Sequence, residues 1–476
     1  MPYIGGKMTQ VGPGRKAAVT GWIEAIRPGR GPRYLQILQA LEHALSDGRL
    51  RPGDRLPPQR QLAAQLHVDL TTVSHAYREA IQRAWIRSLG ARGTYVAASK
   101  VELSGMVDLS MNIPPSPREV DWAESLRQGT SQVLVRNDAD LLMTYHLAGG
   151  GPADRDAARR WLNPMLGKVD IERVATSPGA QSALAALIMT LTTPGEIILT
   201  EPLAYPGLLA AIQQFGRIAM PVATDADGMR PDALEEACRA HRGSVVYLNP
   251  TLQNPSTHTM PESRRREIAA MAVKHGLQII EDDPYWLFAD GAPPPLARIV
   301  PERVHYVSTL SKCLSPGLRT AFVVSPDDNT HRVFLAALRS IALMAAPMMA
   351  ALVTQWILDG TAARIVADVR SEARSRQRLA RKILLGAKGA TYANSAGIHL
   401  WHVLPDHWTS NDLVQVARSE GLALTPSSVF QVASSSQNAI RISLGGGSSR
   451  QSLVAALQKL AALLARQPLL QPSLVV

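Results

Sequence analysis

The sequence predicts an α/β protein built from two dissimilar parts. The N-terminal part has the layout of a winged helix-turn-helix, and the larger body is expected to hold a mostly parallel sheet with a smaller C-terminal α+β subdomain. Helical apolar spacing followed by two strand-like runs fills residues 32–97, whereas short apolar runs alternate with helical stretches over 107–465. The remaining segments are expected to be a flexible leader, a linker and a tail, over residues 1–31, 98–106 and 466–476.

The composition excludes several classes of protein. Of the 476 residues, 46% are hydrophobic and 19% are charged, so the chain can bury a large core and is neither disordered nor fibrous. Its two cysteines cannot form a disulfide framework, which favours a reducing compartment. No apolar run reaches the roughly 20 residues of a membrane span, and the N-terminus lacks the apolar core of a secretion signal. We therefore expect a cytoplasmic protein with no membrane partner, whether its first residue is Met1 or Met8.

The net charge of +11 is concentrated near the N-terminus. Residues 1–100 hold 15 Lys and Arg against 6 Asp and Glu, whereas the other residues hold 35 against 33. A basic domain on a nearly neutral body indicates a polyanionic partner, although a solvated basic surface explains the charge equally well. The charge by itself leaves both explanations open.

The basic domain is predicted to contain three helices and a hairpin. Apolar residues recur every three or four positions over 32–48, which predicts an amphipathic helix. Two further helices follow, and Asp69 is the expected N-cap of the second of them. The further helices and the hairpin are expected over residues 60–66, 70–83 and 87–97. This order of elements is typical of a winged helix-turn-helix.

The segment LRPGDRLPPQRQLAAQLHVDLTTVSHAYREA, followed by ARGTYV, resembles the DNA-binding domain of the GntR family of transcription factors. In such a domain the third helix enters the major groove of double-stranded DNA, while helix N-termini and the wing hold phosphates. The resemblance implies that Arg60, Thr71 and Thr72 contact phosphates. It also implies that Thr71, Ser74 and His75 are exposed on the third helix and face the bases. Any one of them could be an ordinary polar surface residue, but together they favour a DNA-binding surface.

The wing and one turn of this domain have features of their own. Arg92, at the expected tip of the wing, is suited to the DNA backbone or the minor groove. The family usually has Gly where this chain has His67, and often has Arg where it has Leu70. Because a non-glycine residue at positive φ costs about 1 kcal/mol or more, the turn at His67 is expected to differ locally. The loss of a basic residue at Leu70 is expected to weaken DNA binding without abolishing it.

The body is predicted to alternate between strands and helices. The runs VVYL (245–248), LQII (277–280) and AFVV (321–324) are short, apolar and rich in β-branched residues, which predicts buried strands of a doubly wound, mostly parallel sheet. Beyond about residue 360, the runs GIHLWHV (397–403) and AIRISL (439–444) predict strands of the smaller α+β subdomain.

Several segments of the body carry the residue types that would hold a pyridine aldehyde phosphate. Such a cofactor needs a lysine that forms an imine, an acid beside the ring nitrogen, an aromatic stacking partner, and backbone N–H groups with an arginine for the phosphate. The segments SPGAQSALAAL, EPLAYPG, NPTLQNPST, IIEDDPYW and STLSKCLSPGLR follow one another over residues 177–319. Each motif alone is most often a surface feature, but their order and spacing together predict a cofactor site.

This constellation resembles the fold-type I aminotransferases, the aspartate aminotransferase superfamily, across residues 107–465. The resemblance implies that Lys312 forms a Schiff base with pyridoxal 5′-phosphate, that Asp282 pairs with the pyridine nitrogen and that Tyr205 stacks on the ring. Asn254 and Tyr285 match the groups bonded to the 3-oxygen of the cofactor. The phosphate-cup positions are occupied by Ala180, Gln181, Thr309, Ser311 and Arg319.

Two further features of the body bear on its ligands. Arg441, in NAIRISL, matches the arginine that clamps the α-carboxylate of an amino acid, a bidentate task for which lysine is unsuited. Many relatives read Asn-Pro-Thr-Gly where this chain reads Asn254-Pro255-Ser256-Thr257, so this turn is expected to be re-shaped. His399 and His402 lie in a strand-like run and are interpreted as packing residues, and we expect no metal site.

A GntR-type domain joined to an aminotransferase-like body resembles the MocR/GabR family of bacterial transcriptional regulators, over about residues 32–465. The resemblance implies a cytoplasmic, nucleoid-associated homodimer with pyridoxal phosphate on Lys312. A small amine or amino acid, or pyridoxal phosphate itself, would be sensed through aldimine formation, and the response would re-aim the DNA-binding domains. Arg441 favours a carboxylated ligand.

A working aminotransferase with an accessory DNA-binding domain is the alternative. Nothing in the predicted site forbids turnover, since Lys312 could move protons and Arg441 could hold successive substrates. A readable recognition helix has no use in metabolism, however, which favours a regulator with little or no transaminase activity. The effector, the operator, the target genes and the direction of regulation are left open by the sequence.

Overall fold

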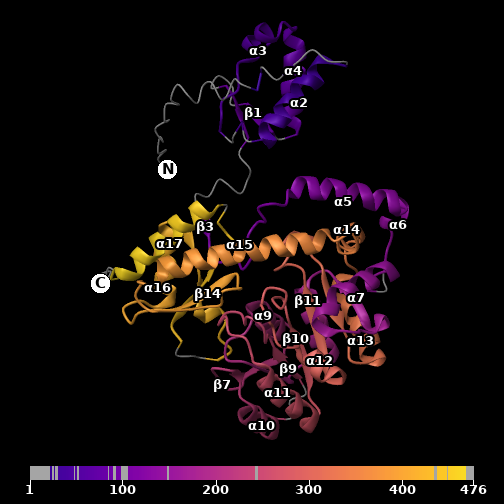
Figure 1. Ribbon diagram of the computed structural model, residues 1–476, viewed down its shortest axis with the longest axis vertical. Helices are drawn as coiled ribbons and strands as arrows, with labels where there is room; N and C mark the ends of the chain where they lie inside the picture. Colours follow the sequence, from indigo (N-terminus) through magenta and orange to yellow (C-terminus); the bar gives the residue numbers. More distant parts are fainter. Residues whose placement is uncertain are drawn as a thin grey trace. The chain divides into compact units, whose positions relative to one another are not determined.

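The computed structural model describes residues 31–47, 49–50, 53–83, 85–88, 93–97, 106–146, 149–241, 245–433, 437–447 and 449–467, together with residues 22, 23 and 26. The chain divides into two compact units, residues 1–105 and 106–476, which we call the head and the body (Figure 1). Nearly all of the predicted linker, most of the predicted tail and Arg92 lie outside the described residues.

The head contains three helices and a β-wing. The helices are α2 (Arg33–Ser46), α3 (Gln59–Leu66) and α4 (Leu70–Gln82), and the antiparallel strands are β1 (Ile86–Ser88) and β2 (Thr94–Val96). An isolated bridge between Arg55 and Tyr95 adds a third segment to the wing. The order of these elements confirms the predicted winged helix-turn-helix.

One apolar core holds the head together. Leu62 of α3, Val73 and Tyr77 of α4 and Ile86 of β1 are buried in it, and the Tyr77 hydroxyl donates a hydrogen bond to Pro57 O at 2.9 Å. Trp22 is completely buried in the same core, although it lies in the predicted flexible leader. The sequence around Trp22 has no apolar periodicity, so this contact could not be predicted. One indole ring buries enough apolar surface to be held in the core without a helix around it.

The turn between α3 and α4 keeps a left-handed residue without a glycine. His67 has φ 50° and ψ 44°, and the N–H groups of His67 and Val68 donate to carbonyls of the last turn of α3. The expected local difference at His67 is therefore not observed, and the conformational cost of a side chain at positive φ falls on His67 itself.

The body is built on a seven-stranded sheet with the order β4–β12–β11–β10–β9–β5–β6. All neighbouring strands are parallel except β12, which is antiparallel to both of its neighbours. This arrangement confirms the predicted mostly parallel sheet, and the three predicted strands correspond to β9, β10 and β12. In sheet order the strands are β4 (Val174–Ser177), β12 (Ala321–Val324), β11 (Val304–Thr309), β10 (Gln278–Asp282), β9 (Val245–Leu248), β5 (Ile197–Thr200) and β6 (Ile218–Pro221).

Helices pack against both faces of this sheet. Alternate strand residues enter different cores: Tyr247 and Ile280 pack with α8, α9 and α13, whereas Val246 and Ile279 pack on the side of α11 and α12. The helices before the C-terminal subdomain are α5 (Trp122–Arg136), α6 (Ala139–Leu142), α7 (Pro152–Leu166), α8 (Ala180–Leu191), α9 (Pro206–Gln214), α10 (Pro231–Ala240), α11 (Glu262–His275), α12 (Leu296–Ile299), α13 (Asp328–Ala342) and α14 (Pro347–Leu358). A small hairpin, β7 (Thr224–Asp225) and β8 (Gly228–Met229), precedes α10.

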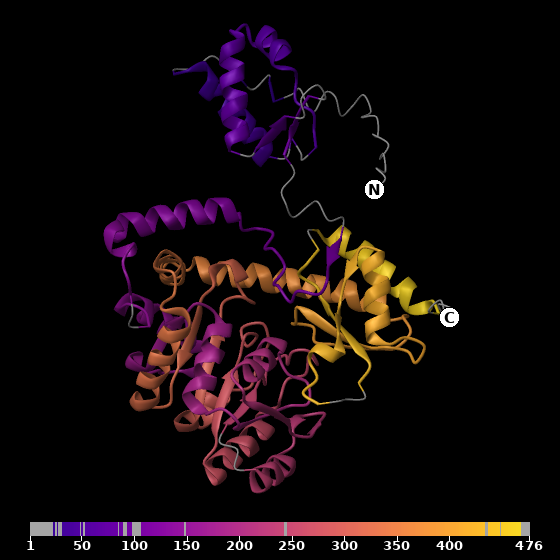
Figure 2. The same cartoon turned by 180° about the vertical axis from the view of Figure 1, so that it is seen from behind.

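The C-terminal subdomain is joined to the large sheet by the long helix α15 (Thr361–Leu384), which runs across the body in both views (Figures 1 and 2). Its sheet has the order β13–β14–β17–β16, as the strand-like runs predict. Its elements are β13 (Ala390–Ala393), β14 (His399–Val403), α16 (Ser410–Ser419), β15 (Leu422–Ala423), β16 (Thr425–Pro426), β17 (Ala439–Ser443) and α17 (Arg450–Ala465). The first strand of the body, β3 (Val107–Asp108), pairs with β15 and so belongs to this subdomain.

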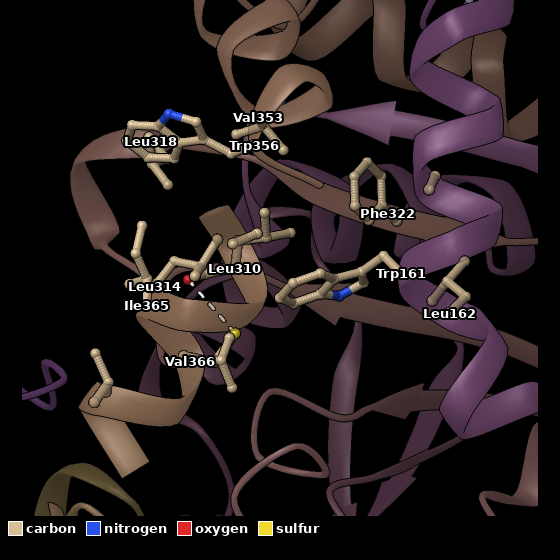
Figure 3. Close-up of a cluster of buried hydrophobic side chains, with 14 of the residues drawn as sticks. Trp161, Leu162, Leu310, Leu314, Leu318, Phe322, Val353, Trp356, Ile365 and Val366 are labelled. Atoms are coloured by element: carbon tan, nitrogen blue, oxygen red, sulfur yellow. Dashed lines mark hydrogen bonds between the residues drawn. The ribbon is translucent and has the colours of Figure 1, made fainter. Parts of the chain in front are cut away.

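The segment that connects β11 to β12 is anchored in a large apolar core. Leu310, Leu314 and Leu318 of this segment are buried among aromatic side chains that include Trp161 and Trp356 (Figure 3). This spacing leaves the side chain of Lys312 free to point away from this apolar core. Within the described part of the chain, no helix has the length and apolar character needed to cross a membrane.

Candidate functional site

The predicted site residues of the body gather at one edge of the large sheet. The strands β4, β5, β9, β10 and β11 are mutually parallel in direction, so their carboxyl ends meet at the same edge. Ligand sites of open α/β sheets lie at this edge. The residues that follow or end these strands are Ala180, Gln181, Tyr205, Asn254, Asp282, Tyr285 and Lys312.

Lys312 is largely buried, and its amine has an unusual environment. The ammonium Nζ donates a hydrogen bond to Asn112 O at 2.5 Å. Burial lowers the pKa of Lys312 to about 8, and the cations of Arg441 and Arg319 act in the same direction, whereas Asp282 opposes them. A substantial fraction of the amine is therefore neutral near physiological pH, which is the form that attacks a carbonyl.

Asp282 presents one carboxylate oxygen without a partner. Its Oδ2 accepts a hydrogen bond from the Tyr247 hydroxyl at 2.8 Å, and its backbone carbonyl accepts one from Asn249 Nδ2 at 2.7 Å. Oδ1 is buried and has no hydrogen-bond partner among the described residues. Burial raises the pKa of Asp282 to about 6, and the neighbouring Asp283 acts in the same direction. The free Oδ1 fits the proton on a pyridine nitrogen, because a buried carboxylate without a donor is costly.

Tyr205 and Gln181 lie close together around Gly207. Tyr205 is half-buried at the start of α9, and Gln181 Nε2 donates to Gly207 O at 2.7 Å. A Cβ at Gly207 would come within 2.5 Å of the Tyr205 ring and would also clash with Gln181. Burial raises the pKa of Tyr205, and Asp282 contributes to the rise, which places the phenol near the carboxylate. The glycine thus lets a ring and an amide lie against the backbone.

The expected phosphate cup combines a helix start with a guanidinium group. Helix α8 begins at Ala180 after Gly179, whose φ is +93°, and a Cβ on Gly179 would lie 2.8 Å from Arg319 Nη2. Arg319 is exposed and donates to Pro178 O at 3.4 Å. Thr309 and Ser311 precede Arg319 in the sequence and are both buried. Ser311 N donates to Thr309 Oγ1 at 3.3 Å. Free N–H groups of a helix start beside a guanidinium suit a phosphate.

Arg441 lies in the same site, on β17. Its Nη1 donates to Asn254 Oδ1 at 2.9 Å, and its Nη2 donates to Ser110 O at 2.5 Å. The guanidinium carbon lies 5.0 Å from the centre of the Phe430 ring, and Nε has no partner among the described residues. Asn254, predicted to bond a cofactor oxygen, is here a partner of Arg441. Burial lowers the pKa of Arg441, so a carboxylate ligand would compensate a buried cation.

Sequence reasoning missed two members of the site and underestimated a third. Asn112 Nδ2 donates to the Tyr285 hydroxyl at 2.7 Å, while Tyr247 holds Asp282. His399, interpreted as a packing residue, is buried with its ring centre 5.8 Å from that of Tyr285. Burial lowers the pKa of His399 to about 3, so the ring is neutral. Asn112 carried no signal because it precedes Lys312 by 200 residues, but Tyr247, a polar tip in the apolar run VVYL, could have been noticed.

The turn that follows Asn254 retains a left-handed residue. Thr257 has φ 68°, and its N–H donates to Gln253 O at 2.7 Å. The threonine therefore takes the conformation for which glycine is favoured, and the expected re-shaping is not observed at this position. The described part of the chain contains no group of three or more His, Cys, Asp or Glu side chains placed to hold a metal ion.

The recognition helix of the head begins with a well-formed cap. Asp69 accepts hydrogen bonds from Thr71 N at 2.7 Å and from Thr71 Oγ1 at 2.5 Å. Arg60, Thr71 and His75 are exposed and Thr72 is half-buried. The cap orders the start of α4, the helix that is predicted to enter the major groove of DNA.

Two of the predicted DNA-contacting residues differ from the rest. Ser74 is half-buried, and its hydroxyl donates to Gln59 Oε1 at 2.7 Å, so it joins α4 to α3 instead of standing on an exposed face. The His75 ring lies 4.2 Å from the Tyr34 ring, centre to centre. Arg92 lies outside the described residues.

Comparison with known proteins supports both halves of the chain. Residues 104–460 match the family model for aminotransferase class I and II, and residues 33–96 match the model for bacterial regulatory proteins of the gntR family. The uncharacterized HTH-type transcriptional regulator YdeF of Bacillus subtilis is 26% identical over 433 residues, which cover 89% of this chain and 92% of that protein. The vitamin B6 salvage pathway transcriptional repressor PtsJ of Salmonella typhimurium is 29% identical over 315 residues, covering 63% and 69%.

A solved structure supports the fold of the body. The α-aminoadipate aminotransferase LysN of Thermus thermophilus, crystallised with N-(5′-phosphopyridoxyl)-L-leucine, superposes with a TM-score of 0.69 at 24% identity and covers 77% of this chain and 94% of its own. This similarity confirms the predicted fold-type I architecture. Because the aminotransferase model spans most of the chain, the protein belongs to the aminotransferase class I and II family, and it carries a GntR-family helix-turn-helix domain at its N-terminus.

Proposed function

We propose that the protein is a DNA-binding transcriptional regulator that holds pyridoxal phosphate in its body and responds there to a small carboxylated amine. The observation that supports the proposal is that one chain combines a helix-turn-helix head with a body that groups the predicted cofactor residues. The head has a capped recognition helix with exposed Thr71 and His75. In the body, Lys312 and Asp282 lie at the carboxyl edge of the large sheet, and Arg441 of β17 contacts Asn254 at the same edge. Regulators such as YdeF, which align with both domains, support this combination.

The residues of the body fit the cofactor. Asp282 Oδ1 has no donor among the described residues, and the start of α8 lies beside the Arg319 guanidinium, which suits a phosphate. Pyridoxal phosphate, when bound, supplies an aldehyde that condenses reversibly with amines and a protonated ring that withdraws electrons. Lys312 would attach it, Asp282 would keep the ring nitrogen protonated and Tyr205 would stack on the ring.

The ligand class follows from Arg441. Its guanidinium is buried and uses weak neutral acceptors, the Asn254 side chain and the Ser110 carbonyl. A carboxylate offers two parallel acceptors and a compensating charge, so it would displace these contacts. An amino acid would thus place its carboxylate on Arg441 and its amine near Lys312. In a variant of this proposal, which the name of PtsJ suggests, pyridoxal phosphate itself is the effector.

A catalytically active aminotransferase is the second candidate function. The observation that favours it is the pKa of Lys312, which burial lowers to about 8, a value that suits a group moving protons near neutral pH. The two candidates share the cofactor and the ligand class, and they differ in whether the amino acid is released as a keto acid.

The deciding experiment combines three measurements on the purified protein. Amino acids are added one at a time, with an acceptor 2-oxo acid of a different carbon skeleton present, while the visible absorption, the release of the keto acid derived from the amino acid and the affinity for double-stranded DNA are recorded. A regulator is expected to show a band shift and a change in DNA affinity with one ligand, without keto acid. Lys312→Ala is the control, because it should lose the band. Steady release of keto acid with unchanged DNA binding would establish the enzyme instead, and a protein that never gains a band would refute the cofactor assignment.

A further inference from the structure

A cavity of the body lies between the large sheet and the C-terminal subdomain. Its volume is about 790 Å³, within the range of small-molecule sites. One wall is formed by residues 201–203, the β7–β8 hairpin and the turn after Gln253, and the other by β14 and the loop that follows it. Of the predicted cofactor and effector residues, none lines this cavity. It therefore has to be considered apart from the site around Lys312.

The lining of this cavity is acidic and aromatic. Glu201, Asp225 and Asp406 contribute carboxylates, and Trp401 and Tyr392 contribute rings. Of the described lining residues, none is Lys or Arg. Asp225 is paired with Arg264 at 2.9 Å, whereas Glu201 and Asp406 form no ion pair with a Lys or Arg of the described residues. Carboxylates beside aromatic faces are the environment that organic cations prefer.

A chain of hydrogen bonds fixes the proton positions next to Glu201. Gln253 Nε2 donates to Leu203 O at 2.7 Å, so its Oε1 is the acceptor for Ser256 N at 2.8 Å and for Ser256 Oγ at 2.6 Å. The hydroxyl proton of Ser256 therefore lies in its hydrogen bond to Gln253 Oε1. Its oxygen can only accept at the 2.8 Å contact with His258 Nδ1, so Nδ1 carries the proton. The other ring nitrogen, Nε2, is left with a lone pair.

When Glu201 is ionised, two acceptor atoms consequently face each other without a donor. His258 Nε2 lies 4.0 Å from Glu201 Oε1, and both atoms are buried with no hydrogen-bond partner among the described residues. Glu201 is only 6% exposed. One nitrogen with two N–H groups can lie within about 2.9 Å of both atoms at this separation. Gly228 borders the gap, since a Cβ there would lie 2.9 Å from Nε2 and 3.3 Å from Oε1.

We propose that this cavity is a second ligand site, which binds an organic cation whose ammonium or guanidinium group donates to Glu201 and His258 and whose carbon chain lies against Trp401. The site goes beyond the proposed function and does not depend on it. Because Glu201 belongs to the large sheet and Trp401 to the C-terminal subdomain, a bound cation would bridge the two. Leu203 lies two residues before Tyr205 in the sequence, and Gln253 directly precedes Asn254. The backbone therefore connects the cavity to the predicted cofactor site.

The titration of Glu201 supplies a signature for the site. Burial raises the pKa of Glu201 to about 7, while burial lowers the pKa of His258 to about 4, with Arg265 acting in the same direction and Asp225 and Asp227 opposing it. A cation stabilises the ionised carboxylate. Binding near pH 7 is therefore expected to release about half a proton from Glu201.

The test uses the full-length protein and N,N′-dimethylputrescine, a diamine whose protonated secondary nitrogens each carry two N–H groups and cannot form a neutral imine with an aldehyde. Isothermal titration calorimetry is expected to show one site per chain, with a loss of affinity of about tenfold or more in Glu201→Gln. Glu262→Gln is the matched control, because it removes the same charge from the exposed start of α11 and should leave the affinity unchanged. Titrations in two buffers measure the proton release, which should vanish in Glu201→Gln.

Two further variants keep the test independent of folding and of the other site. Asp406→Asn changes an exposed residue at the rim and is expected to weaken binding less than Glu201→Gln does. Lys312→Ala should bind the diamine normally, even if it no longer binds pyridoxal phosphate. Absence of binding at millimolar diamine, equal affinity in Glu201→Gln and the unaltered protein, or loss of binding in Lys312→Ala would each overturn the proposal while leaving the regulator hypothesis standing.

Discussion

The environment of Lys312 makes a prediction about pH. Only the neutral amine attacks an aldehyde, so the rate of cofactor attachment is expected to rise through about pH 8 and then level off. Removing the nearby cation in Arg441→Gln should move the midpoint to higher pH, because Arg441 lowers the pKa of Lys312. Stopped-flow absorbance from pH 6 to 10 measures both profiles, with Arg332→Gln on the surface of α13 as the control. A midpoint that Arg441→Gln does not move would show that Arg441 does not contribute to the lowered pKa of Lys312.

The hydrogen bond from Tyr247 to Asp282 makes a second prediction at the residue scale. Asp282→Asn should weaken binding of pyridoxal phosphate by about ten- to a hundredfold, because a charge-assisted hydrogen bond to the ring nitrogen is lost. Tyr247→Phe should have a smaller effect in the same direction, since it removes the group that orients the carboxylate. Absorbance titration gives the affinities.

Tyr306→Phe is a matched control for Tyr247→Phe. It deletes an equally buried hydroxyl whose partner is Asp283, the next residue along the chain, at 3.2 Å. Its cofactor affinity should equal that of the unaltered protein. An equal loss in both tyrosine variants would mean that the strands, not the Asp282 contact, are affected.

Residue-scale prediction is possible where a side chain sits in a motif with its own chemical meaning. Lys312 and Asp282 carry such motifs and lie at the carboxyl edge of the large sheet, and Arg441 of β17 contacts Asn254 there, while their roles toward a cofactor stay predictions. Asn112 could not be found this way, because only the folded chain brings it to Lys312. Ser74 was misjudged because helical spacing does not show that Gln59 of the neighbouring helix receives its hydroxyl.

At the scale of elements, the helix pair α3–α4 leads to a prediction about DNA. Arg60 is exposed on α3 and is expected to contact a phosphate, so Arg60→Ala should weaken binding to all sequences alike. The slope of log K against log salt should become shallower by about 1. Fluorescence anisotropy at several salt concentrations measures the slope. Arg83→Ala is the control, because Arg83 at the end of α4 is held by Glu79 at 3.0 Å; an unchanged slope in Arg60→Ala would remove Arg60 from the interface.

Elements were predictable where local pattern decides their type and unpredictable where their direction or partner matters. Short β-branched runs identified β9, β10 and β12, but nothing in the run AFVV indicates that β12 is antiparallel to its neighbours. The turns at His67 and Thr257 kept positive φ without glycine, since the packing of the elements on either side outweighs a local cost of about 1 kcal/mol.

The surface of the body bears on the assembly of the whole molecule. Val135 and Met143 are each 84% exposed, and Leu141 and Tyr145 are 60% and 73% exposed, all within α5, α6 and the residues that follow each. Monomers rarely expose so many large apolar side chains within a dozen residues. We therefore expect this surface to be covered by a second copy of the chain, in agreement with the proposed homodimer.

A double variant tests this expectation. Analytical ultracentrifugation should give twice the chain mass of 51.4 kDa for the unaltered protein and the chain mass itself for Val135→Glu with Met143→Glu. Leu385→Glu, at an 88% exposed position directly after the end of α15, should remain a dimer. A monomer in all three would refute the homodimer, and a dimer in all three would place its interface elsewhere.

The pairing of β3 with β15 constrains the order in which a newly made chain is completed. Ser110, just after β3, accepts a hydrogen bond from Thr425, 315 residues later. At about 5–20 residues per second, a ribosome needs roughly 15–60 s to supply that partner. The synthesis of the head, which ends at residue 105, is complete when this interval begins. A polypeptide cut or stalled before residue 422 would therefore carry a finished DNA-binding head but lack Arg441, and it would occupy DNA without answering to the ligand.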